Sequence, residues 1–246
     1  MKIVFLGTGH GVPSATRACS CAMIEVGGAL YYVDGGAPIV DRTLLSGRDI
    51  SAVRAMFITH VHGDHIGGVF QFADLIQWYY KTQSCSFFFP EMRAADALRG
   101  LIEAAEDKPL DEERIHLLPA KEGLVYEDEN VRVSYYKTLH LTAEGRHSYG
   151  ILIEAEGKRV YFSGDLSYKL GAEDFPAIAY EDIDLFVCEM AHFGRENLEP
   201  YLPRIRAKVV AFNHVYPLVK YEDIENIGKE FGYKVIAPSD MDEIEI

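Results

Sequence analysis

Residues 59–68 read Thr-His-Val-His-Gly-Asp-His-Ile-Gly-Gly and directly follow the apolar run Ala-Met-Phe-Ile at 55–58. The apolar run predicts a buried strand, and the three glycines allow the chain to turn sharply as it leaves the sheet. Three imidazoles and one carboxylate therefore lie close together at the end of a strand. A polar loop with solvated histidines is the alternative, but few such loops gather three histidines around one aspartate. The stretch predicts a metal site.

The spacing within this stretch favours two metal ions over one. His60 and His62 are two residues apart, so in an extended or turning segment their side chains face the same way. Asp64 and His65 are adjacent, so their side chains must diverge. The two pairs can therefore serve different ions.

Further ligand-type residues follow apolar runs later in the chain, namely His140, Asp165 and His214. His147 is close enough in sequence to compete with His140, but it opens a predicted strand instead of ending one. This position favours His140 as the ligand and leaves His147 for contact with a substrate. The strand ends together supply seven candidate ligands for two divalent ions: His60, His62, Asp64, His65, His140, Asp165 and His214.

Strands and helices alternate along the rest of the chain. The predicted strands are 2–6, 21–26, 29–33, 84–89, 115–118, 130–138, 147–155, 159–162, 183–188 and 208–212, and the predicted helices are 37–47, 69–80, 91–106 and 220–231, with a further helical run ending at 206. The 246 residues are 48% hydrophobic, which is enough for a sizeable core, and no linker-like segment divides them. We expect one domain over residues 1–246.

Composition narrows the possible partners and compartments. The formal net charge is -14, and no cluster of Lys and Arg is present, which disfavours binding to nucleic acid. No stretch approaches the roughly 20 apolar residues that span a bilayer, so we expect no membrane partner. The four cysteines lack zinc-finger spacing, and the N-terminus lacks the apolar stretch of a signal peptide. These features predict a cytoplasmic protein.

The HxHxDH motif at 60–65, placed after a strand, resembles the signature of the metallo-β-lactamase-fold hydrolases. The resemblance implies an α/β fold of the αββα type, with two mixed sheets flanked by helices, over essentially the whole chain. It also implies a division of the ligands: His60, His62 and His140 at the first metal, Asp64, His65 and His214 at the second, and Asp165 bridging the two. Imidazole and carboxylate ligands suit zinc best, with manganese or iron as alternatives.

The resemblance also implies a chemistry. Two ions about 3.5–4 Å apart would hold a bridging water and deliver it as hydroxide to a carbonyl carbon or a phosphorus. Asp64 would both bind metal and orient the attacking water as a base. The redox branch of the family has glutamate where this chain has Gly63, which disfavours reduction of dioxygen or nitric oxide.

Two segments resemble the ribonuclease Z branch in particular. One is the LGTG…P…R pattern that begins at Leu6 and is completed by Pro13 and Arg17. The other, at 191–197, resembles the ribonuclease Z segment that places a proton-donating histidine before the last ligand, and it assigns this role to His192. That family has a small hydroxyl residue after the histidine, whereas this chain has Phe193, so a buried structural histidine is the alternative.

Two acidic residues are expected to support the site. Glu189 is expected to orient His192. Asp34, in the turn Asp-Gly-Gly at 34–36, resembles the family aspartate that caps or orients the metal loop.

We therefore predict a dinuclear metal-dependent hydrolase, a phosphodiesterase that acts on a small diester. A tRNA 3′ processing endonuclease of the ribonuclease Z type is one alternative, but the long arm that grips tRNA has no counterpart, because Asp165 is followed within twenty residues by the strand at 183. A thioester or lactone hydrolase is a second, and a non-catalytic metal-bearing sensor whose mouth is closed around Trp78 or Tyr168 is a third. Relatives of this family commonly pair, so a homodimer is also expected.

Overall fold

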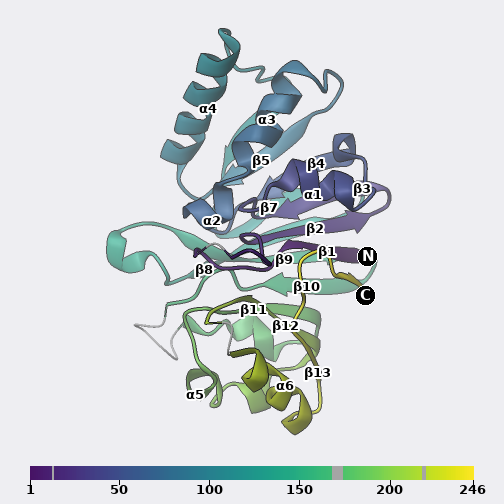
Figure 1. Ribbon diagram of the computed structural model, residues 1–246, viewed down its shortest axis with the longest axis vertical. Coiled ribbons are helices and arrows are strands. Elements are labelled where there is room, and N and C mark those ends of the chain that lie inside the picture. The colour runs from purple at the N-terminus through teal and green to yellow at the C-terminus, as the bar shows by residue number, and fades with distance from the viewer. Residues whose placement is uncertain (13, 168–173, 218–219) are drawn as a thin grey trace.

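Two seven-stranded mixed sheets lie face to face in the computed structural model, and helices cover both outer faces (Figure 1). The structure describes residues 1–12, 14–167, 174–217 and 220–246. Pro13 and Tyr168, both considered from the sequence, lie outside these residues. The predicted αββα architecture is confirmed.

The first sheet has the strand order β14-β1-β2-β3-β4-β5-β6. The strands are β1 Lys2–Gly7, β2 Cys21–Val26, β3 Ala29–Val33, β4 Val53–Phe57, β5 Cys85–Phe89, β6 Ile115–Pro119 and β14 Glu243–Glu245. Pairing is antiparallel from β14 to β3 and parallel from β3 to β6. The helices on this side are α1 Ile39–Leu45, the short α2 Gly63–Ile66, α3 Val69–Trp78 and α4 Met92–Glu106.

The second sheet has the order β13-β12-β11-β10-β9-β8-β7. The strands are β7 Gly123–Glu127, β8 Arg132–Thr138, β9 Ser148–Ala155, β10 Lys158–Phe162, β11 Ile183–Met190, β12 Ala207–Val215 and β13 Lys234–Ile236, and the helices are α5 Arg195–Leu198 and α6 Lys220–Glu230. Its strands are antiparallel from β7 to β10 and parallel from β10 to β13, as in the first sheet.

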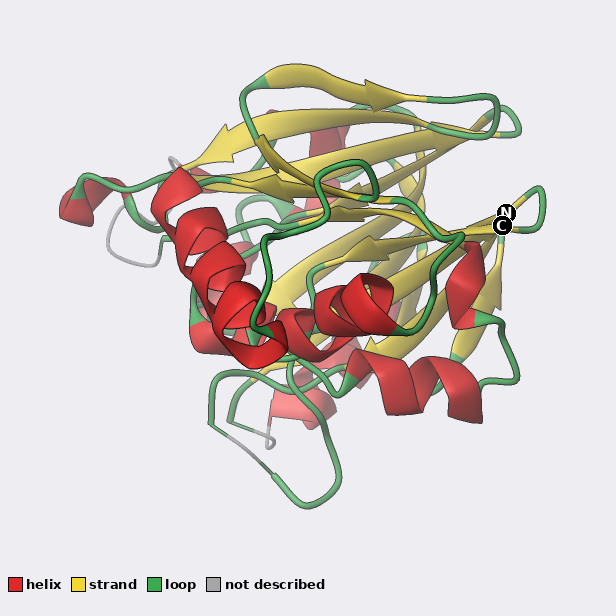
Figure 2. Cartoon of the chain, turned by 90° about the horizontal axis from the view of Figure 1, so that it is seen from above, coloured by secondary structure: helices red, strands yellow, loops and turns green. Residues whose placement is uncertain are grey.

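Three apolar layers hold the sandwich together. The central layer joins the inner faces of both sheets, where Phe57 of β4 and Val187 of β11 are buried. The outer layers join each sheet to its helices, through residues such as Phe72 of α3 on one side and Ile224 of α6 on the other. Because alternate side chains of a strand point to opposite faces, a strand between two such layers is apolar on both faces. Figure 2, seen from above, shows helices lying in front of the strands of the sandwich.

Several predicted elements differ from the observed ones. The strands β7, β13 and β14 were not expected, and the helical run expected before Arg206 consists of α5 and a 3₁₀ turn at Leu202–Arg204. The strand predicted at 208–212 continues to Val215, so His214 lies inside β12 and not beyond its end. None of the described helices is both long enough and apolar enough to cross a bilayer.

Asp240 holds the loop between β1 and β2 in place. Its carboxylate accepts hydrogen bonds from the backbone N–H of Thr8 at 2.9 Å and of Ala18 at 2.7 Å, and from Nη1 of Arg42 at 2.8 Å. Arg17 adds a bond from its Nη1 to the carbonyl of Pro238 at 2.8 Å. A segment near the C-terminus therefore anchors a loop near the N-terminus.

Asp128 joins the two sheets. Its carboxylate accepts hydrogen bonds from the hydroxyl of Tyr31 on β3 at 2.6 Å and of Tyr126 on β7 at 2.9 Å. It also accepts the backbone N–H of Asn130 at 2.8 Å and of Val131 at 2.9 Å. One carboxylate thus satisfies donors from both halves of the sandwich.

Replacement of Asp128 by alanine is expected to lower the free energy of unfolding by about 2–3 kcal/mol, because several partly buried donors lose their acceptor together. Urea denaturation followed by circular dichroism measures the change. Glu129→Ala is the control, since that neighbouring side chain is 69% exposed and pairs only with Arg54 among the described residues. Equal stability of the two variants would contradict the role given to Asp128.

Candidate metal centre

The structure brings together all seven residues predicted as ligands. They form two groups in which the candidate ligand atoms lie within 4.8 Å of one another: His60, His62, His140 and Asp165 in the first, and Asp64, His65 and His214 in the second. His60 and His62 follow β4, Asp64 and His65 lie in α2, His140 follows β8, Asp165 follows β10, and His214 lies in β12. The grouping matches the division that the family resemblance implies, and the ligand roles themselves remain predictions.

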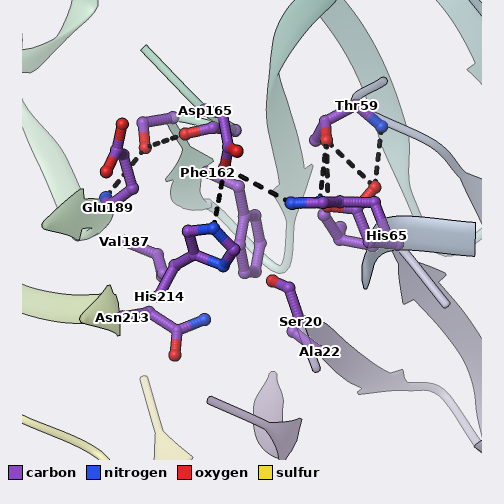
Figure 3. A pocket seen from close by; sticks show the side chains of 14 residues that line it. Ser20, Ala22, Thr59, His65, Phe162, Asp165, Val187, Glu189, Asn213 and His214 are labelled. Carbon is purple, nitrogen blue, oxygen red and sulfur yellow. Dashed lines mark hydrogen bonds and ion pairs between the residues drawn. The ribbon is translucent and has the colours of Figure 1, made fainter. Parts of the chain in front are cut away.

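Asp165 belongs to the first group and also faces the second, as its dashed contacts with His65 and His214 in Figure 3 show. Its Oδ2 is 3.5 Å from Nε2 of His60 in the first group. Its Oδ1 is 3.4 Å from Nε2 of His65 and 3.5 Å from Nε2 of His214 in the second. Burial alone would raise the pKa of this carboxyl, but the neighbouring imidazoles, His214 and His65 foremost, outweigh it and hold the pKa well below its usual range.

A β-bulge aims His214 at this centre. Glu189 of β11 pairs with Asn213 of β12, whereas the next residue, Met190, pairs with Val215. His214 is the extra residue between these pairs, and its φ of 53° places it in the left-handed region. Bulges of this kind redirect a side chain, and a left-handed backbone at a non-glycine residue is typical of functional sites.

The residues present fit a divalent cation. Nε2 of His65 and Oδ1 of Asp165 are buried and lack a hydrogen-bond partner among the described residues, although buried polar atoms are normally paired. Burial, reinforced by His65, lowers the pKa of His60 well below its usual value, so this ring is neutral, as a metal ligand must be. Burial also opposes protonation of His65, but Asp165 and Asp34 outweigh it and raise its pKa well above the usual value. A bound cation would take the place of the additional proton that His65 otherwise holds.

Asp34 orients His65 from behind the centre. Its Oδ2 accepts a hydrogen bond from Nδ1 of His65 at 2.8 Å, which leaves Nε2 directed at Asp165. Its Oδ1 accepts the backbone N–H of Thr59 at 2.8 Å. Gly36 lets this turn approach the motif closely, because a Cβ there would lie 1.6 Å from the carbonyl oxygen of Asp64. Asp34 therefore occupies the orienting position expected from the sequence.

Replacement of Asp34 by asparagine is expected to weaken metal binding at the second group about 10- to 100-fold, as is typical when the partner of a ligating histidine is lost. Asparagine can still accept the N–H of Thr59 through Oδ1, so the fold should persist. Competition with a chromogenic zinc chelator measures the affinity. Asp49→Asn, an exposed carboxylate that accepts the N–H of Ser51, is the control. Unchanged affinity in Asp34→Asn would contradict the orienting role.

His192 stands beside the first group. Its ring centroid lies 4.7 Å from that of His140, and its Nδ1 lies 2.9 Å from Oε1 of Glu189, which is 3% exposed. Burial opposes protonation of His192, but the hydrogen bond and charge of Glu189 outweigh it and raise the pKa to about 9. Glu189 therefore holds the ring as expected, and Nε2 is left without a hydrogen bond to any described residue.

An open cleft of about 340 Å³ gives access to the centre, and His62, Asp64, Asp165, His192 and His214 line it. His10 and Tyr216 form one wall, with ring centroids 3.9 Å apart, and 46% of Tyr216 is exposed. Tyr216 was not predicted, and its position two residues after His214 was the only signal for it. His147 lies apart, exposed and bound through Nδ1 to Glu91 at 2.9 Å, so His140 and not His147 joins the metal group.

Comparisons with known proteins add to this geometry. A model of the family described as Anti-Pycsar protein Apyc1 matches residues 1–228. Among curated relatives, Ribonuclease Z of Pseudomonas putida is 32% identical over 142 residues, covering 57% of this chain and 44% of that protein. Ribonuclease Z of Methanocaldococcus jannaschii is 27% identical over 177 residues, covering 72% and 54%. The matched region thus spans about half the length of these relatives.

Solved structures show the fold. The metallo-β-lactamase-fold protein YhfI from Bacillus subtilis has a TM-score of 0.77 at 16% identity and covers 100% of this chain and 99% of its own. The short form of human tRNase Z has a TM-score of 0.72 at 19% identity, also covering 100% and 99%. A diphosphatase of the PhnP family has a TM-score of 0.69 at 16% identity, covering 100% and 97%. The predicted metallo-β-lactamase fold and the resemblance to the ribonuclease Z branch are confirmed.

Proposed function

We propose that this chain, which belongs to the family described as Anti-Pycsar protein Apyc1, is a metal-dependent phosphodiesterase that hydrolyses a small diester. The observation that carries the proposal is the cluster of seven candidate metal ligands beside one open cleft, which four of them line together with the Glu189-oriented His192. Hydrolysis of a diester needs both activation of water and protonation of a leaving oxygen, and this arrangement offers residues for each.

The residues that would hold two divalent ions, zinc by preference, are His60, His62 and His140 for one, Asp64, His65 and His214 for the other, with Asp165 shared. Bound there, such ions supply activation of water near neutral pH and offset negative charge on the phosphoryl oxygens. The chain itself fixes the positions of these ligands through contacts such as that of Asp34 with His65.

Two residues of the cleft would move protons. Asp64 lies with Oδ2 3.5 Å from Nε2 of His65 and 3.7 Å from Nε2 of His214, and its partly exposed carboxylate can orient the attacking water. His192, protonated at neutral pH and held at Nδ1 by Glu189, would donate its Nε2 proton to the leaving oxygen. Both residues line the same cleft, so Asp64 can orient the attacking water while His192 protonates the leaving oxygen of the same substrate.

A small diester is favoured over a nucleic acid. The net charge of -14 opposes binding of a polyanion, and the sequence between Asp165 and β11 leaves no room for a long tRNA-gripping arm. The curated relatives named Ribonuclease Z nevertheless make tRNA 3′ processing the second candidate. A small-molecule substrate and a homodimeric assembly remain parts of the proposal.

The proposal is tested by turnover of a panel of small phosphodiesters, cyclic and linear, by protein loaded with zinc and, separately, with manganese. A tRNA precursor, a thioester and a lactone complete the panel. We expect diester hydrolysis that Asp64→Ala abolishes. Cleavage of the precursor at the expense of small diesters would favour the second candidate, and turnover of the carbonyl compounds alone would replace both. Two bound metals without any turnover would indicate a sensor.

A further inference from the structure

Lys220, the first residue of α6, donates to three backbone carbonyls of the turn that carries His192. Its Nζ lies 2.9 Å from the oxygen of Met190, 3.2 Å from that of Ala191 and 2.5 Å from that of Phe193. A lysine ammonium has three N–H donors. All three are therefore used by the protein, and Lys220 is not a free cation for binding a substrate.

The backbone N–H groups of the same turn are bound by the carboxylate of Glu189, whose charge is opposite to that of Lys220. Oε2 of Glu189 accepts the N–H of Ala191 at 2.7 Å and of His192 at 2.9 Å, while Oε1 holds Nδ1 of His192. The carboxylate thus binds the N–H groups of the turn and the ammonium of Lys220 binds its C=O groups. Hydrogen bonds to charged partners are stronger than neutral ones, so the turn is fixed from both sides.

The turn needs such support because it lies beyond the sheet. The last pair of the β11–β12 ladder joins Met190 to Val215, and residues 191 and 192 have no ladder partner among the described residues. The helix that carries Lys220 is a firm base, because Ile224 and Ile227 are buried against the second sheet. The turn is therefore tied to a packed element through one side chain.

Lys220 occupies an energetically unfavourable position, and its three hydrogen bonds offset the cost. Helix N-termini favour negative side chains, and Glu222 and Asp223 occupy the first turn of α6 as expected, whereas a lysine at the first position is unfavourable. The half-buried ammonium also loses contact with water. Three convergent carbonyls offset both effects.

We propose that Lys220 is a positioning residue that fixes the turn at 190–193 so that His192 holds its Nε2 toward the leaving group. The inference rests on the proposed function, because it takes His192 as the proton donor. Glu189 sets the rotation of the imidazole ring, and Lys220 sets the path of the backbone from which the ring projects.

The test compares Lys220→Met, which keeps the length of the side chain but not its donors, with Lys220→Arg, which keeps charge and donors. Lys229→Met, on the exposed side of the same helix, is the control. Turnover is measured on a diester with an alkoxide leaving group and on one with p-nitrophenolate, which departs without a proton. We expect Lys220→Met to lower kcat on the alkoxide diester about 10- to 100-fold, as small misplacements of a catalytic group do.

The other readouts separate positioning from general damage. KM, metal content and turnover of the p-nitrophenyl diester should stay within about twofold, and Lys220→Arg should recover most of the loss. In a His192→Ala background, Lys220→Met should have no further effect. Equal losses on both diesters, or a further loss in the His192→Ala background, would overturn the proposal.

A measurement without substrate keeps this test independent of the proposed function. Long-range ¹H–¹⁵N spectra of the imidazoles, assigned with His192→Ala, report whether Nδ1 of His192 remains hydrogen-bonded. We expect the wild-type resonance to persist in Lys220→Arg and Lys229→Met and to shift and broaden in Lys220→Met. An unchanged resonance in Lys220→Met would refute positioning even if no diester is turned over, whereas a shifted resonance in an inactive protein would refute only the proposed function.

Discussion

Replacement of Asp165 by asparagine is expected to remove both metal ions and to lower kcat by more than about 10³-fold. The two oxygens of this carboxylate face different groups, with Oδ2 3.5 Å from His60 and Oδ1 3.4 Å from His65. Asparagine has a similar shape but carries no charge, and it can offer only one oxygen. The change therefore affects both ions, although it alters only one side chain.

Metal content after gel filtration, measured by inductively coupled plasma mass spectrometry, checks the first half of this prediction, and diester turnover checks the second. His62→Gln is the matched control, because His62 belongs to the first group alone and its loss should remove one ion and leave the other. A folded Asp165→Asn protein that still binds two ions would show that the carboxylate does not bridge the groups.

Replacement of His192 by alanine is expected to slow hydrolysis of a diester with an alkoxide leaving group about 10²- to 10⁴-fold, which is the usual contribution of a general acid. The same change should cost less than about tenfold on a p-nitrophenyl diester, because p-nitrophenolate leaves without protonation. The raised pKa of His192, which results from its contact with Glu189, keeps the donor protonated at neutral pH. The ratio of the two rates is the diagnostic quantity.

His147→Ala provides the matched control for this prediction. His147 is close to His140 in the sequence, but it is exposed and bound to Glu91, so its loss should leave both rates nearly unchanged. Equal losses on the two diesters in His192→Ala would instead assign His192 a structural role, as the presence of Phe193 after it suggests.

The gathering of the seven candidate ligands could be predicted from the sequence because each of them, apart from His214, follows a strand or lies in the motif directly after one. An apolar run marks the strand, and the polar residue after it marks the rim of the sheet. The same rule favours His140 over His147, and of these two the structure places only His140 in the group with His60, His62 and Asp165. The motif at 60–65 also predicts the fold, because the family that it resembles has this fold. The likeness to the structure of YhfI covers 100% of this chain.

The features that could not be predicted depend on pairing between segments that are far apart in the sequence. The sequence of a single strand does not show which strand it pairs with or in which register. The bulge at His214 exists because the register of β12 against β11 shifts between Glu189 and Met190. The strands β13 and β14 have three residues each, too few for a periodic pattern. The roles of Tyr216 and Lys220 depend on how β12 and α6 are placed relative to the turn that carries His192. The sequence around these two residues therefore could not indicate their roles.

The anchoring of the β1–β2 loop by Asp240 has a consequence for the order in which the molecule is completed. A ribosome makes the chain from its N-terminus, so Ala18 precedes its carboxylate partner by 222 residues. Every residue of the proposed metal centre has been synthesised before Asp240 emerges. The loop that carries His10, and with it one wall of the cleft, therefore lacks this anchor until Asp240 has been synthesised.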